Sequence, residues 1–195
     1  SYGGLFDHVE GGFARYSTDA IWKVPHFEKM LYDNAQLIQL YSVVYSQTPD
    51  KSEYKSAVNK SIKWLQKELK TSYGSYLCSQ DADSEGVEGA FYCWTENELK
   101  TILKEDFEWF STYFNISEEN IWEEDRYILY KDRGVVDFAL AKSWSIDEFQ
   151  SKLNDSMDLL KEKRTKRKKP AIDTKSLTSW NALLIKAFVH AYIAF

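Results

Sequence analysis

The sequence predicts a mainly α-helical protein built from pairs of helices, with one small β-hairpin in a long loop. Apolar residues recur at helical spacing in several segments, and tight turns alternate with long loops rich in glycine and aromatic residues. A weaker sign is an internal similarity between residues 11–17 and 74–79, which stand in comparable places beside a helix pair. Repeated helix hairpins are typical of a solenoid or of its closed form, a toroid.

The first helix hairpin follows a loop that covers residues 1–24. Pro25 suits the first turn of a helix, where its missing N–H is not needed, and residues 47–50 end this helix. Its apolar residues at helical spacing are Phe27, Met30, Leu31, Ala35, Ile38, Tyr41 and Tyr45. A second helix is expected from about Ser52 to Leu69, and the short connection predicts antiparallel packing.

A small β-hairpin is expected after this helix pair. Two short aromatic segments, residues 73–78 and 90–94, flank the acidic loop 81–89. Aromatic segments on either side of a polar, glycine-containing loop favour two paired strands. The acidic loop then forms an enlarged tip.

The two cysteines, Cys78 and Cys93, stand on the flanks of this hairpin, outside any Cys-x-x-Cys motif. Strands symmetric about Glu85 and Gly86 would place them opposite each other, where a disulfide is geometrically conceivable. A slip of one residue would separate their faces. Because no secretory signal is present, two buried thiols are the favoured alternative.

The region after the hairpin is expected to continue with helices. Thr95 and Glu98 form a capping box that starts a third helix, and a further helical segment covers residues 107–114. Residues 121–137 are expected to be irregular or weakly extended.

Two long helices complete the predicted fold. Ser145 and Glu148 form another capping box, which opens a helix that runs to about Arg164. The last helix begins near Thr178, with Thr178 or Ser179 as its cap.

Composition limits the classes of function. The net charge of −5 argues against a general nucleic-acid-binding protein, and no apolar run is long enough to span a bilayer. The chain opens at Ser1 with no structural element before it, and it closes at Phe195 inside a helical pattern with no glycine or proline to stop the helix. We therefore expect an internal piece of a longer protein, and we expect that protein to be cytoplasmic. Open helix faces on an incomplete ring predict self-association of such a piece.

Two charged features are interpreted as solvated surface. Lys29 and Asp33 are four residues apart and are expected to pair on the outside of the first helix. Residues 161–169 hold seven basic residues and one acidic residue. They have no interleaved aromatic residues for base stacking, so a solvated helix end favoured by the helix dipole is expected.

The first long loop carries one candidate site, formed by His8, Arg15, His26 and Glu28. Histidine transfers protons near neutral pH, and functional residues are common on loops that a rigid scaffold holds. The alternatives are a histidine that packs at the helix start and a glutamate that only complements the helix dipole.

The acidic loop carries the second candidate site. Asp81, Asp83, Glu85 and Gly86 match positions 1, 3, 5 and 6 of a calcium loop, but Tyr92 stands where the loop needs a bidentate glutamate. We therefore reject an EF-hand and predict neither a bound metal nor a cofactor, with a looser metal site as the alternative. The paired carboxylates suit acid–base or glycosidic chemistry, and a solvated hairpin tip is the alternative.

Several motifs together resemble the spermatogenesis-associated protein 20 family, whose bacterial members are usually called thioredoxin-domain-containing proteins. They occur in the family's order over nearly the whole chain. They are Gly11-Gly-Phe-x-Arg-Tyr-Ser-x-Asp19, Trp22, Val24-Pro-His-Phe-Glu-Lys-Met-Leu-Tyr-Asp33, Asp81-Ala-Asp-Ser-Glu-Gly86, Phe91-Tyr-x-Trp-Thr95 and Leu177-Thr-Ser-Trp-Asn181.

The resemblance implies an (α/α)6 toroid similar to N-acylglucosamine 2-epimerases and six-hairpin glycosidases. Residues 1–195 would form part of that one domain, about half of the ring, without the thioredoxin-like domain that precedes it in the family. The long loops would form the mouth of a cavity. The residues that the resemblance places there are Arg15, His26, Glu28, Asp81, Asp83, Glu85 and Trp180.

The sequence-based hypothesis is a carbohydrate-active enzyme that performs acid–base chemistry on a small sugar, as an epimerase or a glycosidase. The alternative is a non-catalytic binding platform that works with a thioredoxin-like domain. The candidate catalytic residues are His26, Glu28, Asp81 and Asp83. The candidate substrate-binding residues are His8, Arg15, Trp22, Glu85, Trp180 and Asn181.

Overall fold

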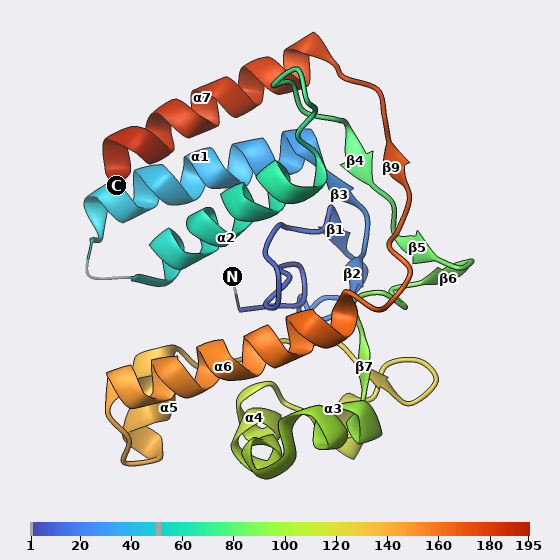
Figure 1. Ribbon diagram of the computed structural model, residues 1–195. Coiled ribbons are helices and arrows are strands. Elements are labelled where there is room, and N and C mark those ends of the chain that lie inside the picture. Colours follow the sequence, from blue (N-terminus) through green and yellow to red (C-terminus); the bar gives the residue numbers. More distant parts are fainter. Residues whose placement is uncertain (1, 50–51) are drawn as a thin grey trace.

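The mainly α-helical class is confirmed by a computed structural model, which describes residues 2–49 and 52–195 (Figure 1). Three long helices form one group and four helices form a second, with the N-terminal loop between α2 and α6 (Figure 1). The first group is α1 (Leu31–Gln47), α2 (Ser52–Glu68) and α7 (Thr178–Ala194). The second group is α3 (Glu96–Leu103), α4 (Phe107–Tyr113), α5 (Val135–Ala141) and α6 (Ile146–Arg164).

Short strands join these groups along one side of the molecule (Figure 1). They are β1 (Tyr16–Ser17), β2 (Pro25–His26), β3 (Lys29–Met30), β4 (Ser79–Gln80), β5 (Asp83–Ser84), β6 (Val87–Glu88), β7 (Trp94–Thr95), β8 (Arg126–Tyr127) and β9 (Ile172–Asp173). The strand pairings in the described residues are antiparallel, and the order β3-β4-β9 brings together three segments that are distant in the sequence.

The first helix begins six residues later than expected. Pro25 lies in β2 rather than in a helical turn, and the helix starts only at Leu31. The reason is long-range pairing, because Lys29 and Met30 pair with β4 and the Leu31 N–H donates to the Cys78 carbonyl at 2.8 Å. The antiparallel packing of α1 and α2 (Figure 1) and the end of α1 at Gln47 are confirmed, while Asp50 lies outside the described residues.

The expected β-hairpin is shorter than its aromatic flanks suggested. Only β5 and β6 pair, around a turn at Glu85 and Gly86, whose φ angles are 57° and 79°. The flanks pair elsewhere, with β4 in the three-stranded sheet and β7 against β8. Cys78 and Cys93 therefore do not share a ladder, and both are free, buried thiols.

The capping signals locate two helix starts correctly. The Thr95 hydroxyl accepts from the Glu98 N–H at 3.2 Å while the Glu98 carboxylate accepts from the Thr95 N–H at 3.0 Å. The Ser145 hydroxyl accepts from the Glu148 N–H at 3.1 Å. The cap expected for α7 is wrong, because Leu177 precedes that helix and offers no side-chain hydrogen bond.

Residues 121–137 include the short strand β8, as expected for a weakly extended segment. The end of this expected segment is wrong, because α5 begins within it at Val135. Phe138 of α5 is buried in the core of the second group, against Tyr113 and Phe149. This aromatic packing stabilises a helix of two turns that local propensity alone does not specify.

The basic stretch 161–169 is not uniformly solvated. Lys161, Lys163, Lys166 and Lys168 are exposed, but Arg164 is buried. Arg167 is partly buried, stacks 4.0 Å from the Trp94 ring centroid and donates to the Cys93 carbonyl at 2.6 Å. Two of the arginines therefore anchor α6 and the chain after it, whereas the lysines face water.

Apolar side chains remain exposed on α7, notably Ile185, Val189, Tyr192 and Ile193. The expected self-association of this chain would use that face, and it stays a prediction. Light scattering tests it, since a strictly monomeric chain with normal cooperative melting would contradict it. Within the described residues, no helix combines the length and the apolar character that crossing a bilayer requires.

Candidate functional site

His26 is held at the surface by the short ladder of β1 and β2, in which it pairs with Tyr16. The connection is shaped by Asp19, whose carboxylate accepts from the N–H groups of Lys23 and Val24 at 3.0 and 2.7 Å. Such an Asx-type loop returns the chain without a regular turn. The Tyr16 ring stacks on the imidazole, with centroids 5.0 Å apart, so one face of His26 is covered.

Two carboxylates flank the imidazole of His26. Its Nδ1 lies 2.8 Å from Glu88 Oε1, and its Nε2 lies 3.8 Å from Glu28 Oε2. The side chain of His26 is 28% exposed and that of Glu88 is 45% exposed, so a ligand can reach them. A carboxylate on one ring nitrogen sets the tautomer and orients the other nitrogen for proton transfer.

Arg15 extends this group on the other side of Glu28. Its guanidinium lies 3.5 Å from Glu28 Oε2, and its Nε donates to the Tyr32 hydroxyl at 3.1 Å. The Tyr32 ring meets Trp180 edge-on at 4.7 Å. The structure thus brings together four residues expected in the site, Arg15, His26, Glu28 and Trp180, with Tyr32 as the link.

Asp33 lies beside this group and has one unsatisfied oxygen. Its Oδ2 is buried and has no hydrogen-bond partner in the described part of the chain. Burial raises the pKa of Asp33 above its ordinary value, while the charge of Arg15 opposes the shift. The expected surface pair of Asp33 with Lys29 is wrong, because Lys29 is buried and bonds to Asp7 instead.

The acidic loop meets the same group through its second strand. Asp83 and Glu88 are direct cross-strand partners in β5 and β6, so they share one face of the hairpin. Asp81 is exposed, and its Oδ1 accepts from the N–H of Ala82 at 2.7 Å. Of the carboxylates expected in this loop, Asp83 is therefore placed nearest to the histidine group by the strand register.

The remaining expected residues lie elsewhere. Trp22 is 60% exposed in the loop between β1 and β2, and Glu85 occupies the tip of the hairpin. Asn181 donates to and accepts from the backbone of Tyr76, at 3.0 and 2.8 Å, which ties α7 to the chain before β4. His8 is buried and its Nε2 lies 3.3 Å from the Gly3 carbonyl, away from the surface.

Three members of the group were not expected from the sequence: Glu88, Tyr16 and Tyr32. The hairpin symmetry about Glu85 and Gly86 contained the signal for Glu88, since it places Glu88 opposite Asp83. For the two tyrosines no comparable local signal exists, because their partners are brought in by β2 and by α7.

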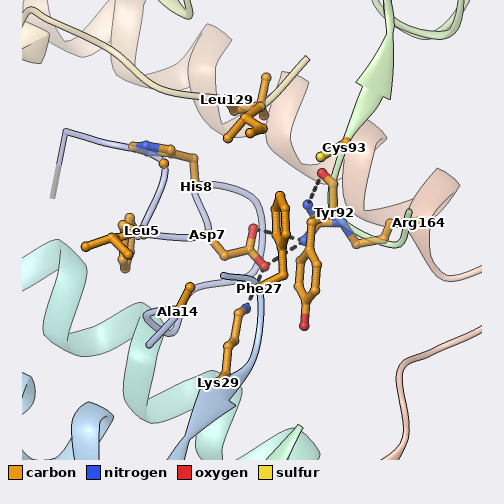
Figure 2. Close-up of a pocket in the computed structure, with 13 residues that line it drawn as sticks. Leu5, Asp7, His8, Ala14, Phe27, Lys29, Tyr92, Cys93, Leu129 and Arg164 are labelled. Atoms are coloured by element: carbon orange, nitrogen blue, oxygen red, sulfur yellow. Dashed lines mark hydrogen bonds and ion pairs between the residues drawn. The ribbon is translucent and has the colours of Figure 1, made fainter. Parts of the chain in front are cut away.

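A second group of charges lies in the interior, around a cavity of about 30 Å³ (Figure 2). The Asp7 carboxylate accepts a hydrogen bond from Lys29 Nζ at 2.9 Å. Both of its oxygens also accept from Arg164 Nη1, at 2.9 and 2.8 Å. These two cations hold the pKa of Asp7 well below its usual range, against the effect of burial. Lys29 also donates to the Gly11 carbonyl at 2.8 Å, where a φ of 89° suits glycine.

This interior group has little capacity for chemistry. The carboxylate of Asp7 is saturated by its two cations, and burial raises the pKa of the Cys93 thiol to about 12. A thiol in that state is protonated at neutral pH and is a poor nucleophile. The cavity is about the size of one water molecule. The exposed group around His26 is therefore the candidate functional site.

Comparisons with known proteins give relatives over almost the whole chain. An uncharacterized protein of Caenorhabditis elegans is 32% identical over 98% of this chain and 30% of its own length. Spermatogenesis-associated protein 20 of Homo sapiens is 32% identical over 95% of this chain and 27% of its own length. The mouse protein of that name is 31% identical with the same coverage. No family model matches the chain. The chain thus spans less than a third of the length of these relatives.

Proposed function

This chain belongs to the spermatogenesis-associated protein 20 family over the segment that its relatives share, and from this premise we propose that the segment supplies a histidine-centred acid–base site to a carbohydrate-active enzyme. The proposal includes an (α/α)6 toroid of the N-acylglucosamine 2-epimerase or six-hairpin glycosidase type for the whole protein, with the site at its mouth. The observation that carries it is His26 held between Glu88 and Glu28, with aromatic rings beside it.

In the epimerase form, His26 exchanges a proton with a sugar carbon next to a carbonyl group. Nδ1 donates to Glu88, and Nε2 takes the proton as the C–H bond breaks and its electron pair passes to the carbonyl oxygen. A second acid, from elsewhere in the longer protein, returns a proton to the opposite face. Arg15 and Glu28 offer a cation and a carboxylate to sugar hydroxyls, and Trp180 offers an apolar edge.

In the glycosidase form, Asp81 or Asp83 supplies a carboxylate for the leaving group or for the attacking water. Asp83 suits this role better in the proposal, because its register partner Glu88 already contacts His26. Neither form uses a bound metal or cofactor.

The test is solvent-proton exchange in the full-length protein. Free sugars and N-acyl sugars are incubated in D₂O with the protein, and loss of the proton next to the carbonyl is followed by NMR. Exchange that persists in His190→Asn but falls at least 100-fold in His26→Asn supports the epimerase form, since a general base contributes about 10²–10⁴-fold. Exchange that is equal in both variants overturns the role of His26.

The binding-platform alternative has an observation of its own in its favour. The side chains of Arg15, Tyr16 and Trp22 are about half exposed or more, so this end of the chain presents an open aromatic and charged surface. In this alternative the surface works with the thioredoxin-like domain expected in the longer protein. It predicts hydrogen-exchange protection of residues 15–26 that is lost when that domain is removed.

A thermal-shift screen of the full-length protein separates the two functions. Monosaccharides, disaccharides and amino sugars are tested with and without calcium. A ligand at 100 times its dissociation constant stabilises by roughly 2.7 kcal/mol, which such a screen detects. A sugar that raises the melting temperature favours the enzyme, whereas a flat screen together with protection of residues 15–26 favours the platform.

A further inference from the structure

A second cavity, of about 90 Å³, lies between α2 and α6, next to the N-terminal loop. It is distinct from the group around His26 and is separated from the smaller interior cavity by His8, which lines both. In Figure 1 the N-terminal loop passes between these two helices. Polar side chains in its wall come from that loop, from both helices and from the segment before α5; among them are His8, Glu53, Ser56, Lys60, Lys131 and Asn154.

Two lysines point their ammonium groups into this part of the molecule without a carboxylate partner. Lys60 Nζ donates to the His8 carbonyl at 3.0 Å, and Lys131 Nζ donates to the Tyr113 hydroxyl at 2.9 Å. Lys131 also lies 5.1 Å from the ring centroids of Tyr2 and Tyr113. In the described ranges 2–49 and 52–195, neither lysine forms an ion pair.

The charges in this wall act on one another. Burial, and then the charge of Lys60, lower the pKa of Lys131 to about 8, while Glu53 opposes the shift. Burial, and then the charges of Lys131 and Lys60, lower the pKa of His8 to about 3, so His8 is neutral at physiological pH. The wall thus holds two cations and one carboxylate, Glu53, which accepts from the Tyr2 hydroxyl at 3.4 Å.

The contrast with Lys29 shows what is missing. Lys60 and Lys131 are partly buried, whereas Lys29 is fully buried and Asp7 supplies its counter-charge at 2.9 Å. Burying an ammonium group without a counter-charge is unfavourable, because the group loses its hydration and gains no ion pair. A bound anion would supply that charge. The volume equals about three water molecules, which is room for a group of a few heavy atoms.

We propose that this cavity binds a small oxyanion, a carboxylate or a phosphate group, between Lys60 and Lys131. Ser56 and Asn154 offer additional hydroxyl and amide donors in the same wall. Because Glu53 offsets one of the two positive charges, the site holds a net single positive charge and suits a monoanion best. The apolar remainder of the wall, including Phe114 and Met157, would keep water from screening the interaction.

The experiment measures binding of acetate and of inorganic phosphate to the full-length protein by calorimetry, with chloride held constant. The Lys60→Met and Lys131→Met variants are compared with Lys63→Met, which changes an exposed lysine on the same helix. At least tenfold weaker binding in the first two variants, with no change in the control, supports the site. The anion that binds more tightly identifies its source as a carboxylate or as a phosphate group.

Two outcomes would overturn the proposal. One is the absence of measurable binding of either anion to the wild-type protein at millimolar concentration. The other is equal affinity in all three variants. A folding defect does not obscure the result, since Lys131→Met removes a partly buried charge that forms no ion pair in the described part of the chain, and it should keep or raise the melting temperature measured without anion.

A pH series with acetate gives an independent readout, because acetate keeps its charge between pH 7 and 9. Binding should weaken over that range as Lys131 loses its proton. The other groups that face the cavity are Lys60, Glu53 and His8, with Tyr2 and Tyr113 against Lys131. A flat profile from pH 7 to 9 would count against a binding role for Lys131.

Discussion

The buried group around Asp7 and the exposed group around His26 both take residues from the same short segment of chain, but they differ in burial and in how their charges are paired. From Pro25 to Met30, buried and partly exposed residues alternate. Phe27 and Lys29 point inward, whereas His26 and Glu28 point outward, as the period of an extended chain requires. The inward charges are fully paired, and the outward charges are open to solvent. One extended segment thus contributes to the buried charged group with one face and to the exposed candidate site with the other.

The largest effect is expected from Asp7→Asn in the buried group. This change leaves Lys29 buried without its counter-charge and Arg164 with only Glu10, at 3.6 Å, so we expect a loss of about 3–5 kcal/mol in the free energy of unfolding. Urea denaturation measures it. The matched control is Asp173→Asn, which breaks an exposed pair with Lys175 and should leave the free energy of unfolding nearly unchanged. Similar losses in both variants would mean that burial does not distinguish these pairs.

The next effect concerns His8 and pH. Since burial lowers the pKa of His8 to about 3, the unfolded chain binds a proton below pH 6.5 that the folded chain does not bind. Stability should therefore fall as the pH drops from about 6.5 toward 3, by about 1.4 kcal/mol for each pH unit. Unfolding measured between pH 6.5 and 4.5 should show a flatter dependence in His8→Gln than in the wild type or in His190→Gln. An unchanged slope would show that other groups carry the dependence.

A smaller effect is expected where Arg167 joins α6 to the segment before α3. Arg167→Lys loses the stacking on Trp94 and the paired contacts with Glu98 at 3.0 and 3.1 Å, because lysine has no planar fork. We expect a loss of about 1–2 kcal/mol, measured by urea denaturation. Lys166→Ala, which changes the exposed lysine one residue before Arg167, is the control and should change the free energy of unfolding by less than about 0.5 kcal/mol.

The smallest effect on stability is expected in the exposed group. Glu88→Gln and His26→Asn change exposed contacts that water already screens, so we expect changes in the free energy of unfolding within about 0.5 kcal/mol. Thermal melting measures this beside the proton-exchange assay. Loss of exchange with unchanged melting would sharpen the contrast between the two groups. A loss of more than about 2 kcal/mol would instead make the His26 group part of the structural core.

Local chemistry accounts for the parts of the fold that the sequence predicted. The capping box at Thr95 and the hydroxyl cap at Ser145 locate α3 and α6, because each cap hydroxyl and the N–H that it satisfies are three residues apart. The apolar periodicity locates α2, because its buried residues recur at helical spacing within the helix itself. Long-range pairing accounts for the failure at Pro25, where β1 and β4 recruit residues that otherwise suit a first helical turn.

The candidate site was predictable only where its members are close in the sequence. His26 and Glu28 are two residues apart, so an extended chain places them on one face. Glu88 is 62 residues from His26, and its role follows from how the acidic hairpin docks. The expectation that the two arginines of the basic stretch are solvated is wrong for a related reason. Their acceptors, Asp7 and the carbonyl of Cys93, lie far away in the chain.

The bond between Asp7 and Arg164 has a consequence for the order of events during synthesis. The two residues are 157 positions apart. At the usual rate of 5–20 residues per second, Asp7 leaves the ribosome roughly 10 to 30 s before its partner. For that interval Lys29 and Asp7 have only each other, and the N-terminal loop has no α6 to close against. The segment around Asp7 is therefore made well before α6 but reaches its final place only with α6, which leaves its aromatic residues open to chaperones in the meantime.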